Sequence, residues 1–118
     1  MIVGLGVDVV ELARFERAVA RTPRLKERLF AESERGLPLR SLAGRFAAKE
    51  ALIKALGGDE GLRWLDIVIR PAASGNPGFV IDGRLAEVLA TREIDALHVS
   101  MSHDGGVAVA TVIAERNG

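Results

Sequence analysis

The sequence contains no cysteine and no tyrosine, and its aromatic residues are limited to one tryptophan and four phenylalanines. The lack of cysteine excludes disulfides, thiolate zinc sites and a cysteine nucleophile. The scarcity of aromatic rings leaves little surface on which nucleic-acid bases could stack, which argues against RNA binding. No nucleic-acid partner is therefore expected.

Long apolar runs are also missing. No segment approaches the ~18 consecutive apolar residues of a membrane span, and the first residues show neither the basic region nor the cleavage site of a signal peptide. The 118 residues are 48% hydrophobic, and a chain of this length should bury roughly 65% of its unfolded surface. We therefore expect one globular domain in the cytoplasm, with no membrane partner.

Basic and acidic side chains are equal in number, 16 of each, but they are unevenly distributed. Residues 1–54 carry 11 basic and 7 acidic groups, whereas residues 55–118 carry 5 and 9. Only three of the cations are lysines. Because the guanidinium fork of arginine suits phosphates and carboxylates, the first half hints at an anionic ligand or an acidic protein. From charge alone, a solvated helix face is the simpler interpretation.

The N-terminal residues predict a β-strand over Ile2–Val10, because apolar residues alternate there. The odd-numbered positions are all apolar, and we expect them to face the core: Val3, Leu5, Val7 and Val9. The other side carries two glycines and then Asp8. Glycine within a strand often marks the close approach of a ligand or another backbone, which makes Asp8 a candidate binding residue. The alternative is that Asp8 ends the strand and caps the next helix.

The longest helical pattern spans Leu39–Leu56 and stops at two glycines. Its predicted buried stripe consists of Leu42, Phe46, Ile53 and Leu56. Lys49 falls inside this stripe, and Arg45 and Glu50 flank it. Because a buried charge needs a partner, Lys49 must either find one or extend its long stem to solvent. Glu50 is too short to escape, which favours a ligand or metal role for it.

A single carboxylate makes a poor metal site, so Glu50 needs a second acidic ligand. Magnesium is usually held by two carboxylates together with substrate phosphates and water. Asp8 is the obvious second ligand, provided that the end of the first strand meets the middle of the long helix. Arg45, Lys49 and Lys54 would then surround the same anion with positive charge, an arrangement suited to phosphoryl transfer.

The rest of the chain predicts short elements around the long helix. Helical spacing covers Glu11–Ala20, Leu25–Phe30 and Arg84–Thr91; strands are predicted over Trp64–Arg70, Phe79–Ile81, Ala96–His103 and Val107–Ala114, a loop over Ala31–Pro38 and a turn over Ala73–Gly78. Asp104-Gly105-Gly106 is a hairpin signal between the last two strands. The sequence therefore predicts an α+β fold with a largely antiparallel sheet packed on the long central helix.

Several catalytic motifs are absent. There is no Gly-x-Ser-x-Gly turn, so Ser102-His103-Asp104 gives no support for a serine hydrolase. There is no phosphate-binding Gly-x-x-x-x-Gly-Lys loop, and Gly4-Leu5-Gly6 lacks the third glycine of a dinucleotide-binding fingerprint. A structural role is the simpler interpretation of each lone histidine.

Three blocks of the sequence resemble the holo-acyl-carrier-protein synthase family. They are Gly4-Leu5-Gly6-Val7-Asp8-Val9-Val10 with Arg14; Arg45-Phe46-Ala47-Ala48-Lys49-Glu50-Ala51 with Lys54-Ala55-Leu56-Gly57; and His98-Val99-Ser100-Met101-Ser102-His103-Asp104. They occur in the family's order and spacing, so the resemblance covers essentially the whole chain. It implies one phosphopantetheinyl transferase domain over residues 1–118.

The resemblance implies transfer of 4′-phosphopantetheine from coenzyme A to a serine of apo acyl carrier protein, with release of 3′,5′-ADP. Asp8 and Glu50 would hold Mg²⁺. Positions matching those around the coenzyme are Asp8, Arg45, Lys49, Lys54, Gly57, Pro77 and His103. The general base stays open among Glu50, Lys54 and a metal-bound water.

The resemblance also implies two protein interfaces. The exposed arginines of the first helix, Arg14, Arg17, Arg21 and Arg24, would dock on the acidic helix of the carrier protein. Short members of the family form trimers with active sites between subunits, so a homotrimer is expected. Two alternatives compete with this function: a non-enzymatic module that binds an acidic protein through its basic helix, and a Mg²⁺-dependent hydrolase of nucleotide diphosphates.

Overall fold

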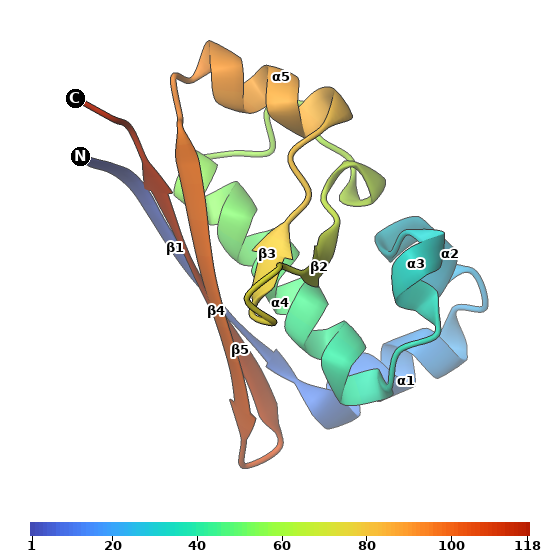
Figure 1. Ribbon diagram of the computed structural model, residues 1–118. Coiled ribbons are helices and arrows are strands. Elements are labelled where there is room, and N and C mark those ends of the chain that lie inside the picture. The colour runs from blue at the N-terminus through green and yellow to red at the C-terminus, as the bar shows by residue number, and fades with distance from the viewer.

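A three-stranded antiparallel sheet lies along one side of the longest helix in the computed structural model, which describes residues 1–118 (Figure 1). The strands are β1 (Ile2–Glu11), β2 (Ile69–Pro71), β3 (Pro77–Phe79), β4 (Ala96–Asp104) and β5 (Val107–Glu115). The helices are α1 (Leu12–Arg21), α2 (Leu25–Leu29), α3 (Glu32–Arg35), α4 (Leu39–Leu56) and α5 (Gly83–Thr91), with a 3-10 turn η1 (Trp64–Asp66).

The main sheet has the order β1-β5-β4, and both pairs are antiparallel. β4 and β5 form the predicted hairpin, whose turn uses Gly105 and Gly106 at positive φ. β2 and β3 make a separate two-stranded sheet. The predicted α+β fold, with an antiparallel sheet on a long helix, is therefore confirmed.

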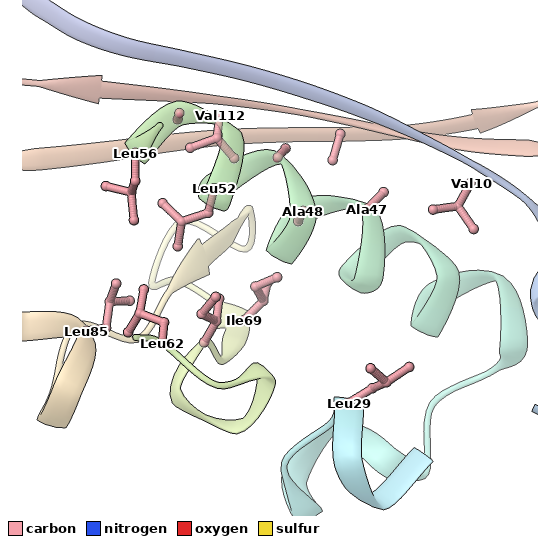
Figure 2. Close-up of a cluster of buried hydrophobic side chains, with 14 of the residues drawn as sticks. Val10, Leu29, Ala47, Ala48, Leu52, Leu56, Leu62, Ile69, Leu85 and Val112 are labelled. Carbon is pink, nitrogen blue, oxygen red and sulfur yellow. The ribbon is translucent and has the colours of Figure 1, made fainter. Parts of the chain in front are cut away.

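Helix α4 is covered on two sides, so more of it is buried than the sequence pattern indicated. The sheet lies against one side, and Leu29, Leu62, Ile69 and Leu85 lie on the other (Figure 2). The predicted stripe was incomplete: alanines on the sheet side are also buried, whereas two stripe residues are only half-buried. The buried alanines are Ala43, Ala47, Ala48, Ala51 and Ala55; the half-buried pair is Phe46 and Ile53. None of the helices combines the length and apolar composition needed to cross a membrane.

The predicted orientation of β1 was wrong. Its glycine side, not its apolar odd-numbered side, packs on α4, because only glycine permits the approach. A Cβ at Gly4 would lie 2.1 Å from the Ala55 carbonyl oxygen, and one at Gly6 would lie 1.9 Å from that of Ala51. Glycines within a strand often mark the close approach of a ligand or another backbone; here the approaching backbone is that of α4. The apolar odd-numbered side is left exposed.

Strand β3 was predicted over Phe79–Ile81 but spans Pro77–Phe79, two residues earlier. Two further local predictions failed. The segment predicted as a strand over Trp64–Arg70 begins instead with η1, which Asp66 stabilises by accepting a hydrogen bond from the Arg63 amide at 2.8 Å. Strand β2 starts only at Ile69. The polar stretch predicted as a loop contains the short helix α3, and its Glu34 is buried. In both cases a side chain stabilises a helical turn that hydrophobic periodicity does not reveal.

Candidate active site

The expected meeting of the first strand and the long helix occurs at Asp8. This residue lies on the α4-facing side of β1, where its Oδ1 accepts a hydrogen bond from Lys54 Nζ at 2.9 Å. The same ammonium donates to the Val7 carbonyl oxygen at 3.1 Å. Asp8 does not cap a helix, since β1 continues to Glu11, which itself occupies the N-cap of α1. The Asp8 carboxylate is therefore not used as a helix cap, and it faces the surface of α4, where it pairs with Lys54.

Glu50 lies one helical turn before Lys54, so its side chain shares that face of α4. Burial raises the pKa of the Glu50 carboxyl above its usual range. The negative charge of Asp8 raises this pKa further, and the positive charge of Lys54 partly offsets it. The two carboxylates thus repel each other across the β1–α4 contact, and a cation between them would relieve that repulsion.

The donor set fits magnesium. Asp8 and Glu50 supply two hard oxygen ligands, and no cluster of three or more acidic, histidine or cysteine side chains is present. Two carboxylates with open positions suit an ion that keeps waters and binds substrate phosphates. A closed structural site would need more protein ligands than these.

A large cleft opens beside Glu50. It has a volume of about 600 Å³. The residues that line it are Arg28, Glu50, Ile53, Asp59, Leu62, Arg63, Trp64 and Leu65. The cleft combines an aromatic ring, apolar side chains and two arginines with a candidate metal ligand. These features suit a ligand that has both an organic body and phosphate groups.

A second hollow lies on the Asp8 side of the site. This groove of about 260 Å³ is lined by Asp8, Val9, Val10, Glu11, Arg14, Phe15, Ala18 and Phe46. It links the Asp8 carboxylate to the surface of α1. The Asp8–Glu50 pair is therefore accessible from both the large cleft and the α1 side.

Arg45 and His103 do not line either of these hollows. They share a separate cavity of about 140 Å³, which also includes Arg40. Gly57 lies at the C-terminal end of α4 with a φ of 78°, and Pro77 begins β3. Within one chain, the structure thus separates Arg45 and His103 from Lys54, which pairs with Asp8.

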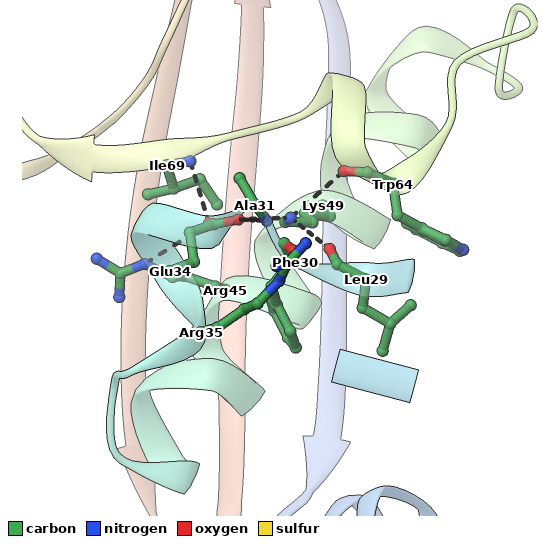
Figure 3. Close-up of polar contacts among 9 residues, drawn as sticks. All are labelled: Leu29, Phe30, Ala31, Glu34, Arg35, Arg45, Lys49, Trp64 and Ile69. Carbon is green, nitrogen blue, oxygen red and sulfur yellow. Dashed lines mark hydrogen bonds and ion pairs between the residues drawn. The ribbon is translucent and has the colours of Figure 1, made fainter. Parts of the chain in front are cut away.

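Lys49 has a different environment from the one expected for a phosphate-binding residue. Its side chain is fully buried, and its ammonium donates to Glu34 Oε1 at 2.8 Å (Figure 3). Burial lowers the pKa of Lys49, and the hydrogen bond to Glu34 and the charge of that residue partly offset this effect. The structure therefore places Lys49 in an internal ion pair, facing Glu34, and neither in solvent nor around the Asp8–Glu50 site.

Sequence reasoning missed Glu34, Arg40 and the residues of η1. The apolar surroundings of Lys49 did signal that a buried partner exists. Its identity was hidden because Glu34 sits in a charged, polar stretch 15 residues away. For Arg40 and Trp64, we find no sequence signal beyond residue type.

The four arginines predicted to dock a protein are all exposed. Arg14, Arg17 and Arg21 lie on α1, and Arg24 follows it. Every ion pair in the structure involves other residues. The charges of the four arginines are therefore available to a partner. Arg14 also lines the groove that reaches Asp8.

Taken together, these features define a small α+β protein in which two carboxylates and a lysine meet at the β1–α4 contact beside a large cleft. Comparisons with known proteins show the family. A profile of the 4′-phosphopantetheinyl transferase superfamily matches residues 4–112. The holo-acyl-carrier-protein synthase of Leifsonia xyli subsp. xyli is 59% identical over 117 residues, which cover 99% of both chains.

Solved structures show the same fold. The crystal structure of holo-acyl-carrier-protein synthase from Neisseria meningitidis aligns with a TM-score of 0.88 at 34% identity, covering 98% of this chain and 100% of that one. The enzyme from Helicobacter pylori, in complex with coenzyme A, aligns with a TM-score of 0.83 at 36% identity, covering 94% and 99%. The present chain belongs to the 4′-phosphopantetheinyl transferase superfamily and is a transferase.

Proposed function

We propose that this protein transfers 4′-phosphopantetheine from coenzyme A to a serine of apo acyl carrier protein, as in fatty acid biosynthesis. The observation that carries the proposal is the Asp8–Glu50 pair, which lies between a large cleft and a helix with exposed arginines. Similarity to named holo-acyl-carrier-protein synthases over nearly the whole chain supports it. Residues 1–118 act as one transferase domain, and we expect it to work in the cytoplasm.

Asp8 and Glu50 would hold Mg²⁺ at this site. When bound, the ion supplies Lewis-acid stabilisation for the negative charge of the coenzyme's diphosphate. Lys54, held by Asp8 and the Val7 carbonyl, adds a second positive charge at the same place. The cleft beside Glu50 accommodates the coenzyme.

The nucleophile comes from the carrier protein, which explains why this chain shows none. The serine oxygen attacks the phosphorus that bears the pantetheine group, and the bond from this phosphorus to 3′,5′-ADP breaks. Lys54 already donates to Asp8, so it is placed to stabilise charge rather than to accept a proton. Glu50, with its raised pKa, is the proposed acceptor of the serine proton.

The arginines of α1 would capture the carrier protein and orient its serine toward Asp8. Exposed cations with no partner in the chain attract an acidic helix over several ångströms, which raises the association rate. Arg14 connects this surface to the active site, since it lines the groove that Asp8 also lines.

Reversing two of these charges should weaken capture of the carrier protein. For the Arg14→Glu/Arg21→Glu variant we expect the KM for acyl carrier protein to rise by roughly tenfold or more, with a weaker dependence on salt. The KM for coenzyme A should stay unchanged. Arg70→Glu, at an exposed arginine on β2, is the matched control. An unchanged salt dependence in the double variant would refute docking on α1.

The exposed face of the main sheet supports assembly into a homotrimer with active sites between subunits. Leu5, Val7 and Val9 of β1 are 64%, 52% and 59% exposed. They pair across the sheet with Ile113, Thr111 and Val109 of β5, of which Ile113 and Val109 extend the apolar surface. A continuous apolar face of this kind is typical of an interface.

The separation of the predicted phosphate-binding residues supports the same assembly. Arg45 and His103 line one cavity, whereas Lys54 pairs with Asp8 on the face of α4 that carries Glu50 and its cleft. A neighbouring subunit could bring its Arg45–His103 cavity to the Glu50 cleft and complete the coenzyme site. If two subunits share the coenzyme site in this way, transfer activity depends on the oligomer.

A charge on the apolar sheet face should therefore separate the subunits. For Val7→Glu we expect a folded monomer by analytical ultracentrifugation and a loss of most transfer activity, because a buried unpaired carboxylate disfavours association. Ile81→Glu is the matched control, since Ile81 is 51% exposed but lies outside the main sheet. A Val7→Glu variant that remains trimeric would contradict the proposed interface.

The proposed reaction is tested directly by incubating the protein with apo acyl carrier protein, coenzyme A and Mg²⁺ and weighing the carrier. The expected result is a gain of one phosphopantetheine, which a chelator prevents. Hydrolysis of coenzyme A without a carrier would favour the diphosphate hydrolase. Carrier binding without either reaction would favour a binding module.

A further inference from the structure

Two oppositely charged side chains are buried outside the Asp8–Glu50 site. Glu34 and Lys49 are 1% and 0% exposed, and their charged atoms are 2.8 Å apart. Charged residues are almost never buried this completely unless they are paired. A pair of apolar residues could often fill the same space at no loss of stability. The pair therefore calls for an explanation other than packing.

The hydrogen bonds of this pair connect four segments to α4. The Glu34 carboxylate accepts from Lys49, from the Ala31 amide at 3.1 Å and from the Ile69 amide at 3.3 Å. Lys49 also donates to the carbonyl oxygens of Leu29 at 2.6 Å and Trp64 at 3.3 Å. The pair thus fixes the ends of α2, α3, η1 and β2 relative to the helix that carries Glu50.

Arg45 lies on the other side of the same carboxylate. Its Nε is 3.8 Å from Glu34 Oε2, close enough for an ion pair but too far for a hydrogen bond. This Nε is buried and has no hydrogen-bond partner. Figure 3 shows the guanidinium of Arg45 on the side of Glu34 opposite Lys49.

This arrangement places Arg45 without using its hydrogen-bond donors. Glu34 has its own hydrogen bonds from Lys49 and two backbone amides, so it attracts Arg45 by charge alone. Arg45 also lines the cavity that contains Arg40 and His103. An anionic ligand in that cavity would therefore meet an arginine that is held in place but not yet hydrogen-bonded.

We propose that Glu34 is a positioning residue for coenzyme binding. Glu34 holds Arg45 in place for an anionic group of the coenzyme, and Lys49 anchors Glu34. This inference rests on the proposed function, because it takes coenzyme A as the ligand. It assigns a role in coenzyme binding to a residue that touches neither the Asp8–Glu50 pair nor the large cleft. A carboxylate fixed by three hydrogen bonds is well suited to such a role, because its position changes little when the ligand binds.

The test is a double-mutant cycle between Glu34 and Arg45, read as coenzyme A affinity by isothermal titration calorimetry. In the wild-type background, Glu34→Gln should raise the Kd for coenzyme A by roughly tenfold. In an Arg45→Ala background the same change should raise it by less than about twofold, because the residue through which Glu34 acts is gone. Glu32→Gln, on the exposed side of α3, is the control and should leave the Kd unchanged.

The coupling separates positioning from a purely structural role. If Glu34 only maintains the fold, Glu34→Gln will raise the Kd by the same factor in both backgrounds, and the proposal is wrong. Thermal unfolding shows whether each variant is folded at the assay temperature. If Glu34→Gln is unfolded at that temperature, the double variant Glu34→Gln/Lys49→Met replaces it in the cycle, because this variant also removes the ammonium that has lost its charged partner. A wild-type protein that binds no coenzyme A would overturn the proposed function together with this inference.

Discussion

Replacing Glu50 with glutamine is expected to lower phosphopantetheine transfer by about a thousandfold or more. The amide keeps the size of the side chain but removes one of the two carboxylates proposed to hold Mg²⁺, which is also the proposed proton acceptor. The fold should not suffer, because burial and the nearby Asp8 already disfavour the ionised form of Glu50. Asp8→Asn should show a similar loss of transfer.

The measurement is the mass of the carrier protein after reaction, together with the thermal unfolding midpoint at increasing Mg²⁺. Ligand binding to the native state raises that midpoint, so added Mg²⁺ should stabilise the wild type and have no effect on Glu50→Gln. Glu87→Gln is the matched control: Glu87 is an exposed helical glutamate that pairs with Arg84 at 3.2 Å. Full transfer by Glu50→Gln would refute the metal assignment.

Replacing Gly6 with alanine is expected to have the largest effect on stability. The new Cβ would lie 1.9 Å from the Ala51 carbonyl oxygen and 2.8 Å from the Ala55 nitrogen, both of them backbone atoms. Helix α4 cannot move away, because its far side packs against Leu62 and Ile69 (Figure 2). We expect the free energy of unfolding to fall by about 3 kcal/mol or more, from a total on the order of 10 kcal/mol.

Thermal denaturation should show this as a midpoint lowered by at least about 10 °C. Any folded fraction should also transfer poorly, because a displaced β1 separates Asp8 from Lys54. Gly36→Ala is the control: Gly36 has a φ of −82°, and a Cβ added there would meet nothing within 4 Å, so the stability of this variant should be unchanged. A Gly6→Ala variant as stable as the wild type would show that the strand and helix are not in such close contact.

Much of the fold could be predicted from local patterns. The long helix has the predicted bounds because its stop is encoded by Gly57, whose φ of 78° favours glycine. The β4–β5 hairpin was equally clear from its alternation and its two turn glycines. The same patterns failed at η1 and α3, where the carboxylates of Asp66 and Glu34 stabilise short helical turns by accepting hydrogen bonds from the amides of Arg63 and Ala31.

By itself, the sequence determined the main elements and the family, which the resemblance of three blocks indicated. It predicted Asp8 and Glu50 as a metal pair with Arg45, Lys49 and Lys54 around the same anion, but in the structure only Lys54 among these cations pairs with Asp8. The spacing of Glu50 and Lys54 within one helix already placed both on a common face. The main elements and the common face need only residue type and local periodicity, whereas the family rests on the resemblance.

Only the tertiary structure decided which face of β1 is buried and which partner Lys49 has. Alternation shows that β1 has two different faces but does not tell which of them is buried. The close approach of α4 buries the glycine face. Glu34 joins Lys49 across 15 residues, a separation at which no local pattern links two side chains. Contacts between distant segments are set by how the whole chain packs, and packing is not encoded in periodicity.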